Sequence, residues 1–120
     1  MSSDILTEIM TTKRRRVAEA KAMLPLEKLQ VIVSDSKSPE PRALTKALSD
    51  NTRLNIIAEF KRRSPSKGMI SEGAEPKSIA REYQHGGACA ISVLTEEDFF
   101  AGSLDDLRSV RAAVALPVLR

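Results

Sequence analysis

Glu59 and Lys61 are the residues whose types and spacing most directly suggest chemistry. They lie near the end of an apolar stretch, in a segment that reads IIAEFKRRSPSKG from Ile56 to Gly68. Alternate residues of a β-strand point to the same face, so both charged side chains are expected to point the same way, with Ile57 behind them. Opposite charges on the inward face of a buried strand are costly unless they pair or serve a site. The spacing therefore predicts an active-site strand. A partly exposed ion pair at a strand end is the alternative.

Two loops carry the other candidate residues. Pro65 in the Ser-Pro-Ser turn fixes its own φ and keeps Ser64 out of the helical region. Gly68 is expected to let this loop move, as lids over active sites do. A second loop, residues 95–102, contains Phe99 and Phe100. The alternatives to ligand contact are an ordinary turn at Ser64 and packing of the second loop through its phenylalanines.

Thiol and metal chemistry have little support in the sequence. The single cysteine, Cys89, cannot form an internal disulfide, which fits a reducing cytoplasm. Its place at the start of an apolar stretch predicts a buried, inert thiol. No Cys and His residues have the spacing of metal ligands. His85 stands just before two glycines, which predicts a surface position at the end of a helix.

The elements that must position these residues alternate in type from Asn55 onward. Before that point, apolar periodicity predicts a helix over residues 4–24 and leaves residues 26–33 ambiguous between helical and extended. The composition of residues 34–41 predicts a linker. The remaining expected elements are a short helix from Pro41 to about Asp50, strands over 55–61, 88–94 and 116–119, loops over 62–75 and 95–102, a helix from Pro76 to Gly86, and a last helix after Ser103.

The last helix has a clear start signal. Ser103 can cap it, and Asp106 stands at the capping-box position three residues later. Helical spacing predicts a buried stripe of apolar residues along it. The residues of this stripe are Leu104, Leu107, Val110 and Val114.

Apolar strands that alternate with amphipathic helices predict an α/β fold with a parallel sheet. Functional loops of such folds follow the carboxyl ends of the strands, and both polar stretches, Glu59–Gly68 and Thr95–Ser103, are expected at that edge. Three strands cannot close a barrel, and a (β/α)8 barrel takes about 250 residues. The chain is therefore expected to be the N-terminal part of a longer protein. Residues 1–54 are expected to form a helical extension, and residues 55–120 the first βαβαβ part of a barrel.

Composition argues against nucleic-acid and membrane partners. The net charge is +3, aromatic residues make up 3% of the chain, and the basic run Lys13–Arg16 is best explained as the solvated face of a helix. No run approaches the roughly 20 apolar residues that span a bilayer. The start of the chain lacks the basic and apolar regions of a secretory signal.

Three segments resemble one enzyme family, indole-3-glycerol phosphate synthase. IIAEFKRRSPSKG is similar to the first-strand signature of that family, and AISVLTEEDFFAGSLDDLRSVR resembles its second strand, second loop and second helix. ALPVLR resembles the start of its third strand, and Lys13 and Val17 match a helical pattern ahead of its barrel. The resemblance implies a TIM barrel of the phosphate-binding kind.

The resemblance also implies a reaction and roles for residues. The family converts 1-(2-carboxyphenylamino)-1-deoxyribulose 5-phosphate to indole-3-glycerol phosphate, with loss of carbon dioxide and water, and uses no metal or organic cofactor. Glu59 and Lys61 match its active-site glutamate and lysine. Lys61 would hold anionic groups and transfer a proton, and Glu59 would orient Lys61 or a substrate hydroxyl. Ser64, with Pro65 in the same turn, matches a substrate-contacting serine, and Phe100 matches an aromatic residue beside the anthranilate ring.

Three alternatives remain open. The family's principal catalytic lysine, in a K-D-F motif, would come directly after Arg120, so residues 1–120 alone are expected to be inactive. A non-catalytic fragment that associates through an unfinished sheet edge is therefore the second interpretation. A phosphoribosylanthranilate isomerase-like barrel is another, and the E-x-K strand and S-P-S loop argue against it. A basic nucleic-acid module is the weakest.

Overall fold

The structure is a computed structural model that describes residues 4–37 and 42–120. The chain forms two compact units, residues 1–41 and residues 42–120. Half of the linker expected over 34–41, residues 38–41, lies outside the described residues, and so does Pro41, where a helix was expected to begin. The expected domain boundary near residue 55 stays a prediction.

The first unit consists of two helices, α1 (Ile5–Met23) and α2 (Leu26–Asp35). The Asp4 side chain accepts a hydrogen bond from the amide of Leu6 and caps α1, which confirms the expected first helix. The ambiguous segment after Pro25 is helical, and the helix runs on through Ser34 into the segment expected to be linker. Neither helix buries a residue, and no described helix of the chain is long and apolar enough to cross a bilayer.

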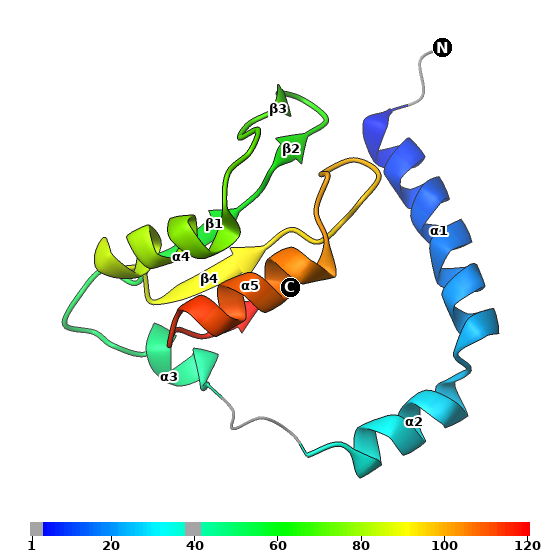
Figure 1. The fold of residues 1–120 in the computed structure, drawn as a ribbon, viewed down its shortest axis with the longest axis horizontal. Coiled ribbons are helices and arrows are strands. Elements are labelled where there is room, and N and C mark those ends of the chain that lie inside the picture. Colours follow the sequence, from blue (N-terminus) through cyan, green and yellow to red (C-terminus); the bar gives the residue numbers. More distant parts are fainter. Residues whose placement is uncertain (1–3, 38–41) are drawn as a thin grey trace. The chain divides into compact units, whose positions relative to one another are not determined.

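The second unit contains a parallel sheet with two helices on one face (Figure 1). Its order is β1-β4-β5, and both neighbouring pairs are parallel, as the sequence predicts. Helices α4 and α5 pack against each other and against the sheet. A short helix, α3, precedes the sheet. The bounds are α3 (Leu44–Leu48), β1 (Ile57–Phe60), α4 (Pro76–His85), β4 (Ala90–Val93), α5 (Leu104–Ala113) and β5 (Val118–Leu119).

The core lies between the sheet and these two helices. Phe60 from β1 and Val93 from β4 are paired in register and buried on this side, together with Val110 of α5. Alternation then places Ile57 and Glu59 on the opposite face, where Ile57 is 43% exposed. The expectation that this strand face is buried is wrong for this chain, because both packed helices lie on the other face.

Helix α5 begins as expected, and its expected buried stripe is wrong at one position, Leu104. The Ser103 hydroxyl accepts a hydrogen bond from the amide of Asp106, and Val110 is fully buried. Leu104 is 42% exposed, so its expected place in the buried stripe is wrong. It precedes the buried Asp106 by two positions, which is about 200° around a helix. The inward position near the start of α5 belongs to a carboxylate.

The loop expected over 62–75 contains a small hairpin. Strands β2 (Arg63–Ser64) and β3 (Gly68–Met69) pair antiparallel and project beyond the end of β1 (Figure 1). Gly68 has a φ of +66°, a conformation that disfavours residues with a side chain. The Ile70 amide donates to the carbonyl of Arg62 at 2.8 Å and closes the base of the hairpin. The loop is therefore more ordered than its Ser, Gly and Pro content suggests.

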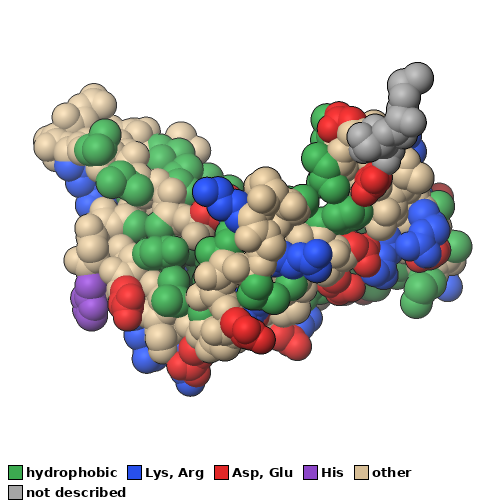
Figure 2. Space-filling view, turned by 90° about the horizontal axis from the view of Figure 1, so that it is seen from above, with side chains coloured by type: hydrophobic (Ala, Val, Ile, Leu, Met, Phe, Trp, Pro, Cys, Tyr) green, Lys and Arg blue, Asp and Glu red, His purple; other side chains and the backbone are tan. Residues whose placement is uncertain are grey.

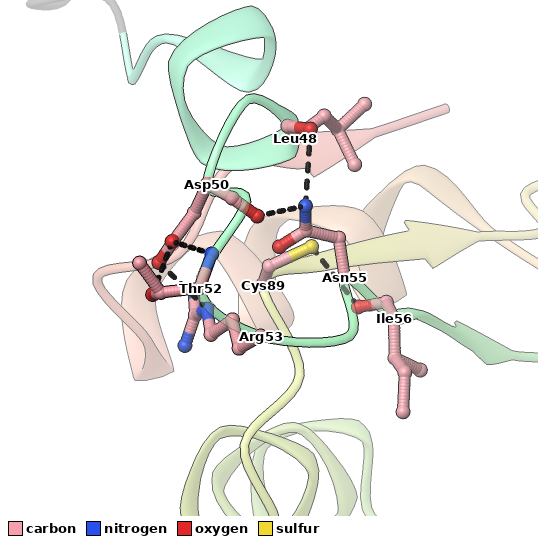
Figure 3. A network of polar contacts seen from close by, with 7 residues as sticks. All are labelled: Leu48, Asp50, Thr52, Arg53, Asn55, Ile56 and Cys89. Atoms are coloured by element: carbon pink, nitrogen blue, oxygen red, sulfur yellow. Dashed lines mark hydrogen bonds and ion pairs between the residues drawn. The ribbon is translucent and has the colours of Figure 1, made fainter.

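A polar network holds the chain where it enters β1, at the opposite end of the strand from Lys61 (Figure 3). The Asn55 amide nitrogen donates to the carbonyls of Leu48 at 3.0 Å and Asp50 at 2.9 Å. Hydrogen bonds from the Thr52 hydroxyl and amide lower the pKa of the Asp50 carboxyl. These contacts fasten the turn after α3 to the start of the sheet.

Cys89 belongs to the same end of the sheet. Its amide and its thiol both donate to the carbonyl of Ile56, at 2.9 Å and 3.2 Å, and its side chain is 2% exposed. The expected buried thiol is confirmed. Cys89 therefore contributes to the pairing of β1 with β4.

Arg42 ties the start of the second unit to the end of α5. One guanidinium nitrogen, Nη1, donates to the carbonyls of Arg111 at 3.3 Å, Val114 at 2.6 Å and Leu116 at 3.1 Å. Carbonyls at the end of a helix have no partner within the helix, so a cation there is favourable. Burial, and then the charge of Arg111, lower the pKa of Arg42, but a guanidinium stays charged at neutral pH.

Replacing Arg42 with methionine is expected to lower the free energy of unfolding by about 1.5–3 kcal/mol, the usual contribution of hydrogen bonds to a charged group. Urea unfolding of the chain measures the change. The matched control is Arg53→Met, because Arg53 is 48% exposed and makes a surface ion pair with Asp50. Such pairs contribute about 1 kcal/mol or less. Equal losses for both variants would contradict the role given to Arg42.

Candidate active site

The two polar loops leave the sheet at the same edge. Strands β1 and β4 are adjacent and parallel, Phe60 is level with Val93, and the Leu94 amide donates to the carbonyl of Phe60 at 3.1 Å. The segments that start at Lys61 and at Thr95 therefore begin side by side. The expectation from the sequence for this edge is confirmed.

Glu59 and Lys61 point the same way, as strand alternation predicts. The Lys61 ammonium Nζ lies 3.4 Å from Glu59 Oε1, and the two side chains are 33% and 46% exposed. The Tyr83 hydroxyl donates to the Glu59 carbonyl at 3.1 Å and links this point of β1 to α4. A pair this exposed adds about 1 kcal/mol or less to stability. Both charges are accessible from solvent on the face of the sheet opposite α4 and α5.

Ser64 lies in the hairpin, 7% exposed. Its hydroxyl oxygen accepts a hydrogen bond from the Lys67 amide at 3.2 Å and lies 3.4 Å from the Ser66 hydroxyl oxygen. Pro65 is exposed at the tip of the turn. In this arrangement the Ser64 hydroxyl organises its own turn. The structure does not bring Ser64 into contact with the Glu59–Lys61 pair.

Phe100 lies in the second loop, where it is partly buried. Its amide and that of Phe99 both donate to Glu96 Oε2, at 3.1 Å and 2.6 Å. The Glu96 carboxylate is thus at the centre of the loop that carries both phenylalanines. Glu96 has no signal in the sequence beyond its place near the start of the loop.

Arg62 and Asp106 form a partly buried ion pair that was not predicted from the sequence. Arg62 Nε and Nη2 donate to the two oxygens of Asp106 at 2.8 Å and 2.7 Å, and Nη1 donates to the carbonyl of Ala74 at 3.0 Å. The guanidinium carbon also lies 5.3 Å from the centre of the Phe60 ring, within cation–π range. These contacts join the end of β1 to the start of α5 and to the segment before α4.

The geometry of this pair accounts for a raised pKa at Arg62. The Arg62 and Asp106 side chains are 24% and 9% exposed, and their fork-to-fork arrangement gives two parallel hydrogen bonds. Hydrogen bonds to Asp106 raise the pKa of the Arg62 guanidinium above its ordinary value. Strand alternation was the available sequence signal for this contact, because it turns Arg62 away from Lys61 and toward the helices.

Metal-ligand groups were not expected from the sequence. Among residues 4–37 and 42–120, no three His, Cys, Asp or Glu side chains are grouped so that they could hold a metal ion.

Parallel strands with helices packed on one face, and polar loops at the carboxyl ends of those strands, are the arrangement of the β/α units of a TIM-type barrel. The comparisons with known proteins identify the protein family. The family model described as indole-3-glycerol phosphate synthase matches residues 6–120. The chain belongs to the indole-3-glycerol phosphate synthase family, and that family has the TIM-barrel fold. The resemblance seen in the sequence and the expected α/β fold class are confirmed.

Curated relatives cover nearly the whole chain. The indole-3-glycerol phosphate synthase of Leifsonia xyli is 47% identical over 120 residues, which are 100% of this chain and 45% of the relative. Those of Rhodopirellula baltica and Bacteroides thetaiotaomicron are 45% and 44% identical, over 97% and 98% of this chain and 44% of each relative. The chain therefore spans less than half of the length of these relatives.

Proposed function

We propose that this chain supplies the first part of an indole-3-glycerol phosphate synthase active site. The reaction would close a ring between an aryl carbon and the ketone of 1-(2-carboxyphenylamino)-1-deoxyribulose 5-phosphate, with loss of carbon dioxide and water. The observation that carries the proposal is the Glu59–Lys61 pair, on the face of the sheet opposite α4 and α5, at the carboxyl end of β1. In a closed barrel that face lines the interior, and catalytic residues come from strand ends.

Lys61 is proposed to act directly on the substrate. Its ammonium would hold an anionic group and give a proton to the ketone oxygen as the ring closes. Glu59, at 3.4 Å, would keep that ammonium in place and balance its charge. The weak, exposed pairing supports this division of work, because little stability is lost when substrate replaces one partner of the pair.

The loops are proposed to contact the rest of the substrate. Phe100 would lie beside the anthranilate ring, and Ser64, with Pro65, would form the rim of the site at the first loop. The Ser64 hydroxyl is bound within its turn, so its contact with substrate requires the hairpin to rearrange. Positive φ at Gly68 provides a position where this can occur.

We also propose the substrate class, the compartment, the cofactor requirement and the domain organisation of the enzyme. The substrate is a phosphorylated small molecule, the compartment is the cytoplasm, and neither a metal nor an organic cofactor takes part. Residues 1–54 are proposed to be a helical extension ahead of the barrel part at 55–120. Within each unit, the side in view in Figure 2 has acidic side chains interspersed with basic ones, which favours a small-molecule ligand over a nucleic acid.

Association through the sheet edge is the second candidate. In the order β1-β4-β5 the outer sides of β1 and β5 have no neighbouring strand within the described sheet. Such edges can pair with strands of another chain. Residues 1–120 alone are proposed to have no synthase activity, since the resemblance would put the family's principal catalytic lysine directly after Arg120.

The test is growth without tryptophan. A complete barrel is made by replacing the matching segment of the full-length Leifsonia xyli relative with residues 1–120 of this chain. It is expected to restore growth of a strain that lacks indole-3-glycerol phosphate synthase, while residues 1–120 alone do not. The relative's own gene is the positive control. Failure of a stably folded barrel to restore growth would contradict the proposal.

A further inference from the structure

The loop between β4 and α5 is built around the carboxylate of Glu96. Glu96 Oε1 accepts a hydrogen bond from the Asp98 amide at 3.1 Å, and Oε2 accepts from Phe99 at 2.6 Å and Phe100 at 3.1 Å. Amides bound to a carboxylate form stronger hydrogen bonds than neutral pairs do. A single side chain therefore satisfies three consecutive backbone donors that no strand or helix satisfies.

The ends of the same loop are also held together. The Gly102 amide donates to the Glu96 carbonyl at 2.8 Å, and Ala101 has a φ of +52°. A Cβ atom on Gly102 would clash with the Leu94 carbonyl oxygen, so the exit of the loop packs directly on its entry. The backbone on both sides of Phe100 is thus fixed, and Glu96 supplies the contacts inside the loop.

We propose that Glu96 is a positioning residue for substrate binding, which acts by fixing the backbone from which Phe100 presents its ring. The proposal rests on the proposed function, in which Phe100 contacts the aromatic ring of the substrate. Glu96 itself uses both carboxylate oxygens on backbone amides. The proposed effect of Glu96 on substrate binding is exerted through Phe100, whose amide it holds.

The kinetic test uses the complete barrel with Glu96→Ala, Phe100→Ala and the double variant. Glu96→Ala is expected to raise KM roughly tenfold, because Phe100 loses the contacts that fix its backbone, and the two residues are energetically coupled. The value of kcat is expected to change little. In the Phe100→Ala background, Glu96→Ala is expected to add almost nothing. Glu97→Gln, which removes the same charge from the same loop, is the control and is expected to keep the parent KM. Glu96→Gln keeps one acceptor oxygen and should lie between parent and alanine.

Two results would overturn the proposal. One is an unchanged KM in Glu96→Ala. The other is an increase in KM that is equally large with and without Phe100, since a purely structural effect would not depend on that ring.

A second measurement does not depend on turnover and so separates this proposal from the proposed function. In the 120-residue chain, hydrogen exchange at the amides of Phe99 and Phe100 is expected to be at least about tenfold faster in Glu96→Ala than in Glu97→Gln. Equal exchange in the two variants would show that Glu96 does not hold the loop. A parent barrel that binds and turns over no substrate would instead refute the function, whatever the exchange shows. If Glu96→Ala does not fold, Glu96→Gln serves in both measurements.

Discussion

Replacing Lys61 with methionine is expected to lower the turnover of the complete barrel by about 10²- to 10⁴-fold, the usual contribution of a positioned acid or base. Methionine keeps an unbranched apolar side chain and removes the ammonium. Stability should change by about 1 kcal/mol or less, because Lys61 is 33% exposed and its pairing with Glu59 is a surface one. The measurements are steady-state kinetics and thermal unfolding of the same samples.

Lys67→Met provides the control for that experiment. Lys67 is an exposed lysine of the neighbouring hairpin turn, and in the structure its backbone amide, which the substitution keeps, binds Ser64. Its variant should turn over at nearly the parent rate. A Lys61→Met barrel that keeps parent turnover would show that the pair is an ordinary ion pair at a strand end, which was the alternative from the sequence.

The second large effect is on stability. Arg62→Met is expected to cost about 3 kcal/mol in urea unfolding, because it leaves the Asp106 carboxylate, 9% exposed, without its guanidinium partner. This value is the low end for buried pairs, since Arg62 keeps 24% of its side chain in solvent. Adding Asp106→Leu should restore much of the loss, because the double variant no longer buries an unpaired charge.

Helix α5 offers a matched control for burial. Arg108 and Asp105 are also joined at 2.7 Å, but their side chains are 71% and 86% exposed. Arg108→Met should cost about 0.5 kcal/mol or less, the usual contribution of exposed helical pairs. Similar losses for Arg62→Met and Arg108→Met would mean that burial does not set the energetics of the Arg62 pair.

The sequence predicted those parts of the fold that follow from apolar periodicity. Apolar runs alternating with helical patterns predicted the parallel sheet, and strand parity predicted that Glu59 and Lys61 share a face. Local start signals also worked, since Ser103 caps α5. Each of these depends on residues that are near one another in the chain.

The parts that were missed depend on long-range contacts. Asp106 was assigned to a capping box, and its partner lies 44 residues earlier in the chain. That pairing takes the inward position at the start of α5 and leaves Leu104 exposed. Exposure of Ile57 was missed because strand alternation predicts which residues share a face, and does not predict what covers that face.

Residues 1–120 are proposed to form one wall of an indole-3-glycerol phosphate synthase site. The most direct test is a fluorescence assay for indole-3-glycerol phosphate formed by the purified complete barrel from 1-(2-carboxyphenylamino)-1-deoxyribulose 5-phosphate. We expect product and carbon dioxide in equal amounts, with product formation reduced at least about 10²-fold by Lys61→Met. A folded barrel that forms no product, while the Leifsonia xyli relative does so under the same conditions, would contradict it.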